Sequence, residues 1–142
     1  MRKRSLAREH ALKIMYQAEI NRRPMSVSTG IYWGENLEEK DHTIIDFCDR
    51  LINGIEQNVD KIDAEISKYT ENWQLKRMAV IDRNVLRLGV YEILMTSDIP
   101  PKVTINEAVE LAKKYGDMES GKFVNGILDK IHKTENMSHK TI

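Results

Sequence analysis

Residues 80–95, VIDRNVLRLGVYEILM, are the stretch of sequence that decides the fold. Apolar side chains recur there at helical spacing and fall on more than one face of the expected helix. One row consists of Ile81, Val85 and Leu88, and the other of Leu86, Val90 and Ile93. A helix with two apolar rows must be covered on several sides. The stretch therefore predicts the central, most enclosed helix of an all-α protein.

The chain after this segment shows further helix signals. Pro100–Pro101 ends the central helix, because proline disrupts a helix interior and restricts the preceding residue to extended backbone. Thr104, followed three residues later by Glu107, has the form of a capping box, which predicts that a fifth helix opens there. Gly116 is the expected C-terminal stop of that helix.

A sixth helix is expected from near Ser120, with a polar, frayed tail after His132. Within it, Asn125–Gly126 is also a hairpin-turn signal. The surrounding apolar spacing of three and four favours a helix, in which a glycine costs about 1 kcal/mol relative to alanine. We expect Gly126 to allow close contact between helices.

Three amphipathic helices are expected before residue 80. The first begins near residue 5 and ends near residue 21, the second follows Asp41, and the third runs from residue 59 to 69 after a cap at Asn58. Residues 22–40 are predicted to form a long irregular loop, held on the body by Tyr32 and Trp33. The loop prediction rests on a Ser/Thr cluster together with Pro24, Gly30 and Gly34.

Helical periodicity breaks at residues 71–76, so we place an internal boundary there. It divides the chain into an N-terminal helical subdomain, residues 1–72, and a C-terminal helical subdomain, residues 73–142. The path of the segment from Arg22 to Lys40 does not follow from any sequence rule.

Composition narrows the class of protein. With 41% hydrophobic and 31% charged residues, the 142-residue chain is typical of a globular protein, and no apolar run reaches the ~18 residues of a membrane span. One cysteine, Cys48, excludes an internal disulfide framework and favours a reducing, cytoplasmic location. The four histidines lack metal-ligand spacing, and no nucleotide-binding or hydrolase motif occurs. We expect no metal, no cofactor and no enzymatic activity.

The net charge of zero conceals a strongly basic N-terminus. Residues 1–23 carry seven cations against two carboxylates, a net charge of +5 that the other residues balance with −5. Arg2, Lys3 and Arg4 lead into the first helix, and Arg8 follows Arg4 by one turn on the same side. Cations in a first turn oppose the helix dipole at a typical cost of about 0.3–1 kcal/mol each. This placement favours a phosphate-binding segment over a merely solvated terminus, although composition leaves both open.

Aromatic side chains accompany these cations. Tyr16 lies two turns after Arg8 and is either a stacking surface for a base or a core residue. Lys122 beside Phe123 repeats the pairing of a cation with an aromatic ring. Stacking side chains suit single-stranded RNA better than duplex DNA, because the sequence shows no polar helix typical of a major-groove reader.

Four groups of residues resemble the NusB family of bacterial transcription antitermination factors, over residues 2 to about 131. They are AREHAL at 7–12 with Tyr16–Gln17; Asp82–Arg83 with Leu86–Arg87 and Tyr91–Glu92; PKVTINEAVELAK at 101–113; and KFVNGIL at 122–128. The segments INEAVELAKKYG and KFVNGIL are the specific ones.

The resemblance implies a fold of two perpendicular three-helix bundles and an adaptor function. Proteins of this family bind boxA RNA together with NusE, a ribosomal protein, and join NusA, NusG and RNA polymerase to support processive transcription of ribosomal RNA operons. The resemblance places the RNA contacts at Arg2, Lys3, Arg4, Arg8, Tyr16, Lys122 and Phe123. It places Asp82, Arg83 and Glu119 near the contact region for RNA and NusE.

This chain departs from the family pattern at two places. Ser5 and Leu6 interrupt what is often a denser basic run, and Gly121 stands where a bulkier residue is common. Both departures are expected to shift binding energy from RNA towards the protein partner. Two other interpretations stay open: a helical protein-interaction module with a solubilising basic end, and the N-terminal RNA-binding module of a ribosomal RNA methyltransferase. The sequence does not fix the oligomeric state, and a homodimer is one option.

Overall fold

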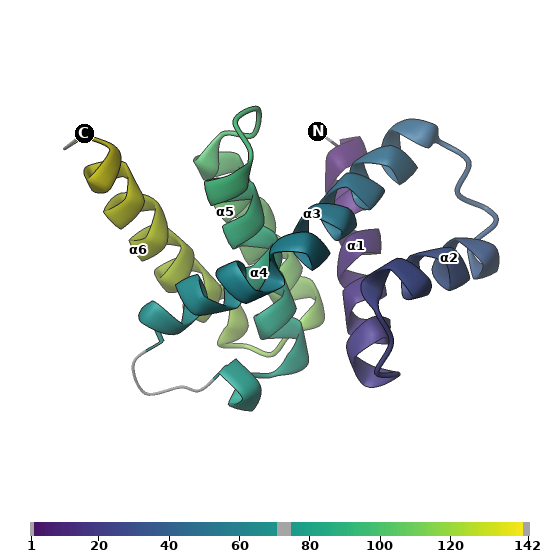
Figure 1. The fold of residues 1–142 in the computed structure, drawn as a ribbon, viewed down its shortest axis with the longest axis horizontal. Coiled ribbons are helices and arrows are strands. Elements are labelled where there is room, and N and C mark those ends of the chain that lie inside the picture. Colours follow the sequence, from purple (N-terminus) through teal and green to yellow (C-terminus); the bar gives the residue numbers. More distant parts are fainter. Residues whose placement is uncertain (1, 71–74, 141–142) are drawn as a thin grey trace. The chain divides into compact units, whose positions relative to one another are not determined.

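The computed structural model describes residues 2–70 and 75–140, with side chains described as far as residue 135. These residues form helices and no strand, so the all-α prediction is confirmed (Figure 1). The elements are α1 (Arg2–Ile20), α2 (Met25–Glu35), α3 (His42–Lys68), the 3-10 helix η1 (Leu75–Arg77), α4 (Val80–Met95), α5 (Pro101–Tyr115) and α6 (Ser120–Lys140). Contacts divide the chain into two compact units, Met1–Val59 and Asp60–Ile142.

The first unit contains α1, α2 and the greater part of α3. Its core includes one row of α1 that consists mostly of alanines, because Ala7, Ala11, Ile14 and Ala18 are all buried. Small side chains let neighbouring helices approach α1 closely along this row. Arg2, Lys3, Arg4 and Lys13 of α1 lie off this row and are exposed.

The predicted irregular segment at residues 22–40 is wrong, because residues 25–35 form α2. Pro24 stands at the N-cap position, where a missing backbone N–H costs nothing. Tyr32 is buried, with its hydroxyl 2.6 Å from Nδ1 of His10, and Trp33 donates from Nε1 to Asp49 at 3.1 Å. These contacts anchor the segment as expected. They hold it as a helix even though two glycines weaken its local preference.

Helix α3 begins directly after Asp41, as predicted. The Asp41 carboxylate accepts a hydrogen bond from the backbone N–H of Thr43 at 2.9 Å, which makes Asp41 the cap. Asn58 has non-helical backbone angles, φ −122° and ψ 16°, so the predicted break occurs there. Its side chain donates to the carbonyl of Gly54 at 2.8 Å and thereby closes the preceding helical segment.

The division between the units falls just after this break, between Val59 and Asp60. The predicted boundary at residue 72 lies outside the described residues. The last part of α3 belongs to the second unit, and there Arg87 of α4 donates to both oxygens of Asp63, at 2.8 and 2.9 Å. A two-point contact of this kind fixes orientation as well as distance.

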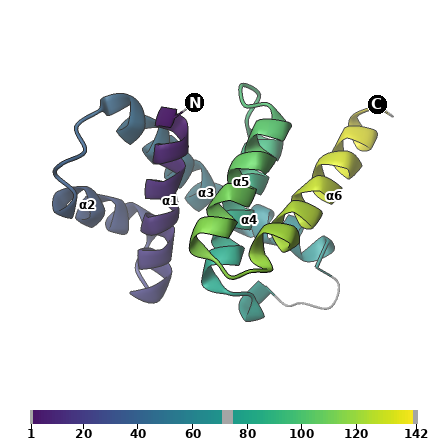
Figure 2. The ribbon, with the colours of Figure 1, turned by 180° about the vertical axis from the view of Figure 1, so that it is seen from behind.

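Helix α4 is the central element of the second unit, as residues 80–95 predict. Val85, Leu86, Leu88 and Val90 are all buried. Helices α5 and α6 lie beside one another in both views (Figures 1 and 2). Gly89 permits the close approach of α4 and α6, since a Cβ at this position would lie 2.6 Å from the Leu128 side chain. This close contact was expected at Gly126, where a Cβ would meet nothing within 4 Å, so that expectation is wrong.

Replacing Gly126 by alanine is therefore expected to stabilise the protein by about 1 kcal/mol, because Gly126 lies exposed inside α6 and gains only helix preference. Chemical denaturation of both proteins would measure the difference in unfolding free energy. Gly89→Ala is the matched control and is expected to destabilise the protein. A loss of stability in Gly126→Ala would show that the glycine has a structural role.

The predicted capping box at Thr104 is also wrong. Helix α5 starts three residues earlier, at Pro101, with Pro100 as its N-cap. Thr104 is buried, and its hydroxyl donates to the Glu92 carboxylate at 2.7 Å. Proline at the first helical position has the required φ and lacks only an N–H that would be unbonded in any case. Pro100 and Pro101 therefore determine where α5 begins, and the spacing of Thr104 and Glu107 does not.

The turn from α5 to α6 agrees with the prediction of a stop at Gly116. A Cβ at this position would lie 2.7 Å from the Ala112 carbonyl, so close approach of the backbone requires glycine. Asp117 then caps α6 by accepting from the N–H groups of Glu119 and Ser120, at 3.0 and 3.1 Å. The helix continues to Lys140, which corrects the expectation of a frayed tail after His132.

Candidate nucleic-acid interface

The first turn of α1 carries the predicted basic segment, which we define as Arg2, Lys3 and Arg4. All three side chains are exposed, and the turn contains no acidic residue. Arg4 places its guanidinium 4.5 Å from the centre of the Phe47 ring on α3. The basic segment is therefore a cationic surface with one of its groups laid against an aromatic ring.

Lys3 is paired with the cap of α3. Its Nζ lies 3.1 Å from Asp41 Oδ2, and the side chains are 60% and 34% exposed. The hydrogen bond from Lys3 and that from the Thr43 N–H lower the pKa of Asp41 below its usual value. This contribution to stability is complete above the normal aspartate pKa and is lost as the pH falls through the lowered one. The pair is exposed enough for a phosphate to compete for Lys3.

Arg8, which the family resemblance places among the RNA contacts, is buried. It is only 3% exposed, and its guanidinium lies 5.4 Å from the centre of the Phe47 ring. Its side chain is thus part of the packing beneath the basic segment. For Tyr16 the sequence left two options, a stacking surface or a core residue. Its side chain is 41% exposed, so Tyr16 lies outside the core.

Sequence reasoning missed two residues at this surface, Phe47 and Arg50. Phe47 is buried, and three guanidinium groups lie within 6 Å of the centre of its ring. The third belongs to Arg50, 5.7 Å from the ring centre. The spacing of Phe47 and Arg50, three residues apart on a helix, was the available signal, because residues so spaced share a face.

The second unit contains the remaining predicted contacts. Lys122 is exposed and Phe123 is half-buried near the start of α6. Phe123 lines a cavity of about 260 Å³ together with Met78, Ala79, Asp82, Asp117, Glu119 and Ser120. The structure thereby brings Asp82, Glu119 and Phe123 around one hollow. Oδ1 of Asp82 is buried without a hydrogen-bond partner among the described residues.

Arg83, the third predicted partner contact, has its charge engaged within the second unit. It is 8% exposed, and its Nη1 donates to the carbonyls of Leu75 and Met78, both at 2.9 Å. These bonds hold η1 against the start of α4. Arg83 therefore supports Met78, one of the residues that line the cavity.

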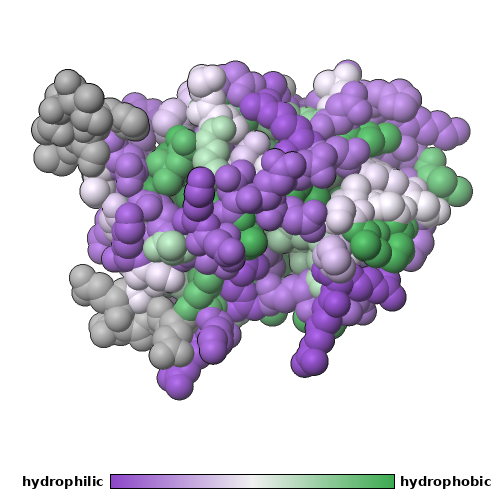
Figure 3. Space-filling model, viewed as in Figure 1, coloured by the Kyte–Doolittle hydropathy of each residue, from purple (hydrophilic) through white to green (hydrophobic). Residues whose placement is uncertain are grey.

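In the part of the chain that the structure describes, no group of three or more His, Cys, Asp or Glu side chains is arranged to hold a metal ion. Cys48 is buried, and burial strongly raises the pKa of its thiol. No helix there is long and apolar enough to cross a membrane. Hydrophilic side chains cover much of the face seen in Figure 3.

The fold and the basic segment define an all-helical protein with a cationic surface on its first helix, a class that includes helical nucleic-acid-binding proteins. The NusB family model matches residues 5–133. The chain belongs to the NusB family.

Individual relatives agree with this assignment. The transcription antitermination protein NusB of Thermodesulfovibrio yellowstonii is 43% identical, over 98% of this chain and 97% of its own length. The solved structure of T. maritima NusB is 44% identical with a TM-score of 0.82, over 92% of this chain and 90% of that one. A structure of the antitermination factors NusB and NusE in complex with dsRNA matches with a TM-score of 0.86 at 29% identity, over 94% of this chain and 98% of that one.

Proposed function

We propose that this protein is a non-catalytic transcription antitermination factor that acts in the cytoplasm. It binds boxA-type RNA together with a NusE-type ribosomal protein and supports processive transcription of ribosomal RNA operons, in a larger complex with NusA, NusG and RNA polymerase. The observation that carries the proposal is the match, over 94% of the chain, to a solved complex of NusB, NusE and RNA. The exposed basic segment on α1 supplies the chemistry that RNA binding needs.

Within this function, Arg2, Lys3 and Arg4 contact RNA phosphates, and the exposed ring of Tyr16 stacks on a base. Arg8 supports the basic segment from beneath. Lys122 and Phe123 contribute a second cation and a second aromatic surface from α6. Phosphate contacts position the RNA, while stacking on unpaired bases adds preference for single strands.

Asp82 and Glu119 offer carboxylates to the protein partner or to the RNA-bound complex. The unpartnered Oδ1 of Asp82 favours a donor supplied by a partner, because a buried acceptor without a hydrogen bond is unfavourable. A cationic side chain of a ribosomal protein has the required chemistry. Arg83 acts indirectly, through the carbonyls that shape the cavity wall.

The test is a titration of labelled single-stranded boxA RNA, with and without NusE, against a scrambled strand and a duplex of the same sequence. We expect tighter binding to boxA than to the scrambled strand, and a further gain with NusE that is reciprocal, as linkage requires. The duplex is included because the related solved complex contains dsRNA. Equal affinity for boxA and scrambled RNA, unchanged by NusE, would contradict the proposal.

Replacing Asp41 by asparagine is expected to raise RNA affinity by about twofold to fivefold, the range of a weak exposed ion pair. Asparagine caps a helix as well as aspartate does, so α3 keeps its start while Lys3 is released for phosphate. Fluorescence titration at constant salt would measure the change. Glu38→Gln, which removes another exposed carboxylate of the same unit, is the control and should change affinity little. An equal gain in both variants would point to net charge alone.

A further inference from the structure

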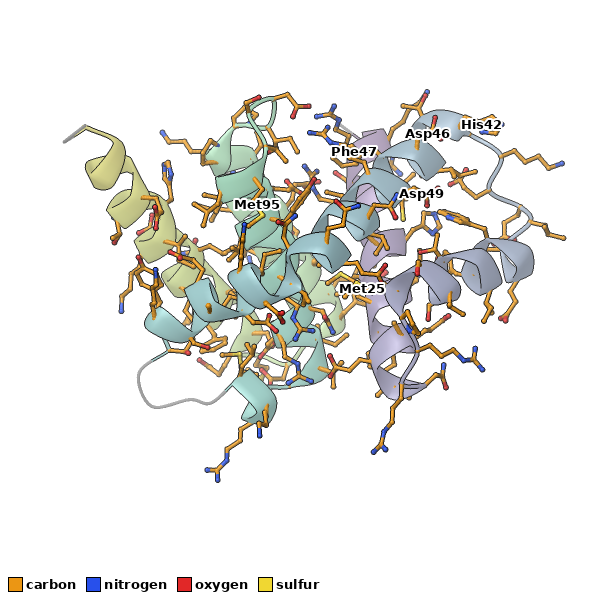
Figure 4. The ribbon with its side chains drawn as sticks, in the orientation of Figure 1. Met25, His42, Asp46, Phe47, Asp49 and Met95 are labelled. Atoms are coloured by element: carbon orange, nitrogen blue, oxygen red, sulfur yellow. The ribbon has the colours of Figure 1, made fainter. Side chains whose placement is uncertain are left out.

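Three guanidinium groups from two helices converge on one aromatic ring. Arg4 and Arg8 of α1 lie 4.5 and 5.4 Å from the centre of the Phe47 ring, and Arg50 of α3 lies 5.7 Å from it. Phe47 lies on the part of α3 that is next to α1 (Figure 4). The cationic surface therefore does not end with α1 but continues onto α3.

The four side chains differ in burial. Phe47 is 7% exposed and Arg8 is 3% exposed, so both are fixed in the packing. Arg4 is exposed and Arg50 is half-buried, so both reach the surface. The buried ring of Phe47 therefore contacts two arginines that reach the surface, Arg4 and Arg50.

Stacking leaves an arginine able to bind phosphate. A guanidinium group that lies over a ring uses its flat face, while its N–H donors point outward in the plane of the group. Those donors match the paired oxygens of a phosphate. An arginine held against a ring also loses less side-chain freedom when it binds, so more of the interaction appears as affinity.

We propose that Arg50 is a further phosphate-binding residue for RNA, and that Phe47 is a positioning residue that holds Arg4 and Arg50 for this contact. The inference rests on the proposed RNA-binding function and deepens it. It extends the RNA contacts of the first unit from the basic segment on α1 to α3, at a residue that the family resemblance does not include.

The first test compares Arg50→Gln with Arg4→Gln in boxA RNA titrations over a range of salt concentrations. Each variant is expected to weaken binding by about threefold to tenfold and to reduce the magnitude of the slope of log affinity against log salt by about 0.7, the value for one phosphate contact on a single strand. Arg23→Gln removes an exposed cation of the same unit outside the cluster and is the matched control. It should leave the slope unchanged.

The second test concerns Phe47. Phe47→Leu keeps an apolar side chain but removes the ring, and is expected to weaken RNA binding about as much as Arg50→Gln does. Phe47→Tyr keeps the ring face and should bind RNA like the unaltered protein, whereas Phe47→Met, which keeps a long apolar side chain without the ring, should bind as weakly as Phe47→Leu. Circular dichroism would confirm that each variant is folded. Because Arg50 is a surface residue, the first test stands even if a Phe47 variant does not fold.

The outcomes separate the inference from the function. If Arg4→Gln weakens binding and Arg50→Gln does not, the role of Arg50 is overturned while the RNA-binding function stands. If folded Phe47→Leu binds RNA like the unaltered protein, the positioning role is overturned. If the unaltered protein shows no salt-dependent RNA binding, both the function and the inference are overturned.

Discussion

Replacing Arg2, Lys3 and Arg4 together by glutamine is expected to weaken boxA RNA binding by about a hundredfold at ~0.1 M salt. Each phosphate contact on a single strand adds about 0.7 to the dependence of log affinity on log salt, which at this salt is about fivefold per contact. Three exposed cations therefore account for about two powers of ten. Titration at several salt concentrations should show the magnitude of the slope falling by about 2.

The matched control replaces Lys13, Arg22 and Arg23, the other three exposed cations among residues 1–23. The same charge is removed from the same unit, so a loss that depends on net charge would be equal in both triple variants. We expect a small effect in the control. Thermal stability of the first variant should change little, because removing unfavourable cations from the first helical turn offsets the loss of the Lys3–Asp41 pair and of the Arg4 contact with Phe47. Clear destabilisation would indicate a structural role for the basic segment.

Replacing Thr104 by valine is expected to lower the unfolding free energy by about 3 kcal/mol. Valine has nearly the same shape but cannot donate the 2.7 Å hydrogen bond to Glu92, whose carboxylate is 1% exposed. A buried charged acceptor that loses a donor costs more than a neutral one. Urea denaturation followed by circular dichroism would measure the difference.

Thr104→Ser is the control for this variant, because serine keeps the hydroxyl and loses only a methyl group. Its expected cost is about 1 kcal/mol. If the valine variant were no less stable than the serine variant, the hydrogen bond between α4 and α5 would contribute little. RNA binding of both folded variants should match that of the unaltered protein, since neither Thr104 nor Glu92 lies in the proposed interface.

Local patterns in the sequence predicted most of the fold. Helix α4 follows from the two apolar rows in residues 80–95, and the break in α3 follows from Asn58. Helix α2 could not be predicted in this way, because Gly30 and Gly34 inside it are local signals against a helix. Its support comes from His10 and Asp49, which are far away in sequence. Thr104 was misread for the same reason, since its partner Glu92 precedes it by twelve residues.

In the candidate site, too, some residues could be predicted from local sequence patterns and others could not. The local composition and the unfavourable placement of cations in a first helical turn are enough to predict the exposed basic segment. The burial of Arg8 could have been inferred, because Leu12 and Met15, both fully buried, lie one and two turns later on the same side of the helix. The contact of Arg50 with Phe47 follows from their spacing on one helix, but the approach of Arg4 and Arg8 depends on two helices meeting, which no single-segment pattern contains.

The non-helical residue at Asn58 has a practical consequence for cutting this protein into pieces. A fragment that starts at residue 73 would omit Ile62 and Ile66, both fully buried, and would leave Arg87 without the Asp63 carboxylate. A fragment that starts near Asp60 retains all three. Expression trials and gene fusions that treat the C-terminal half as an independent module should therefore be trimmed at the bend in α3, and not at the stretch before η1.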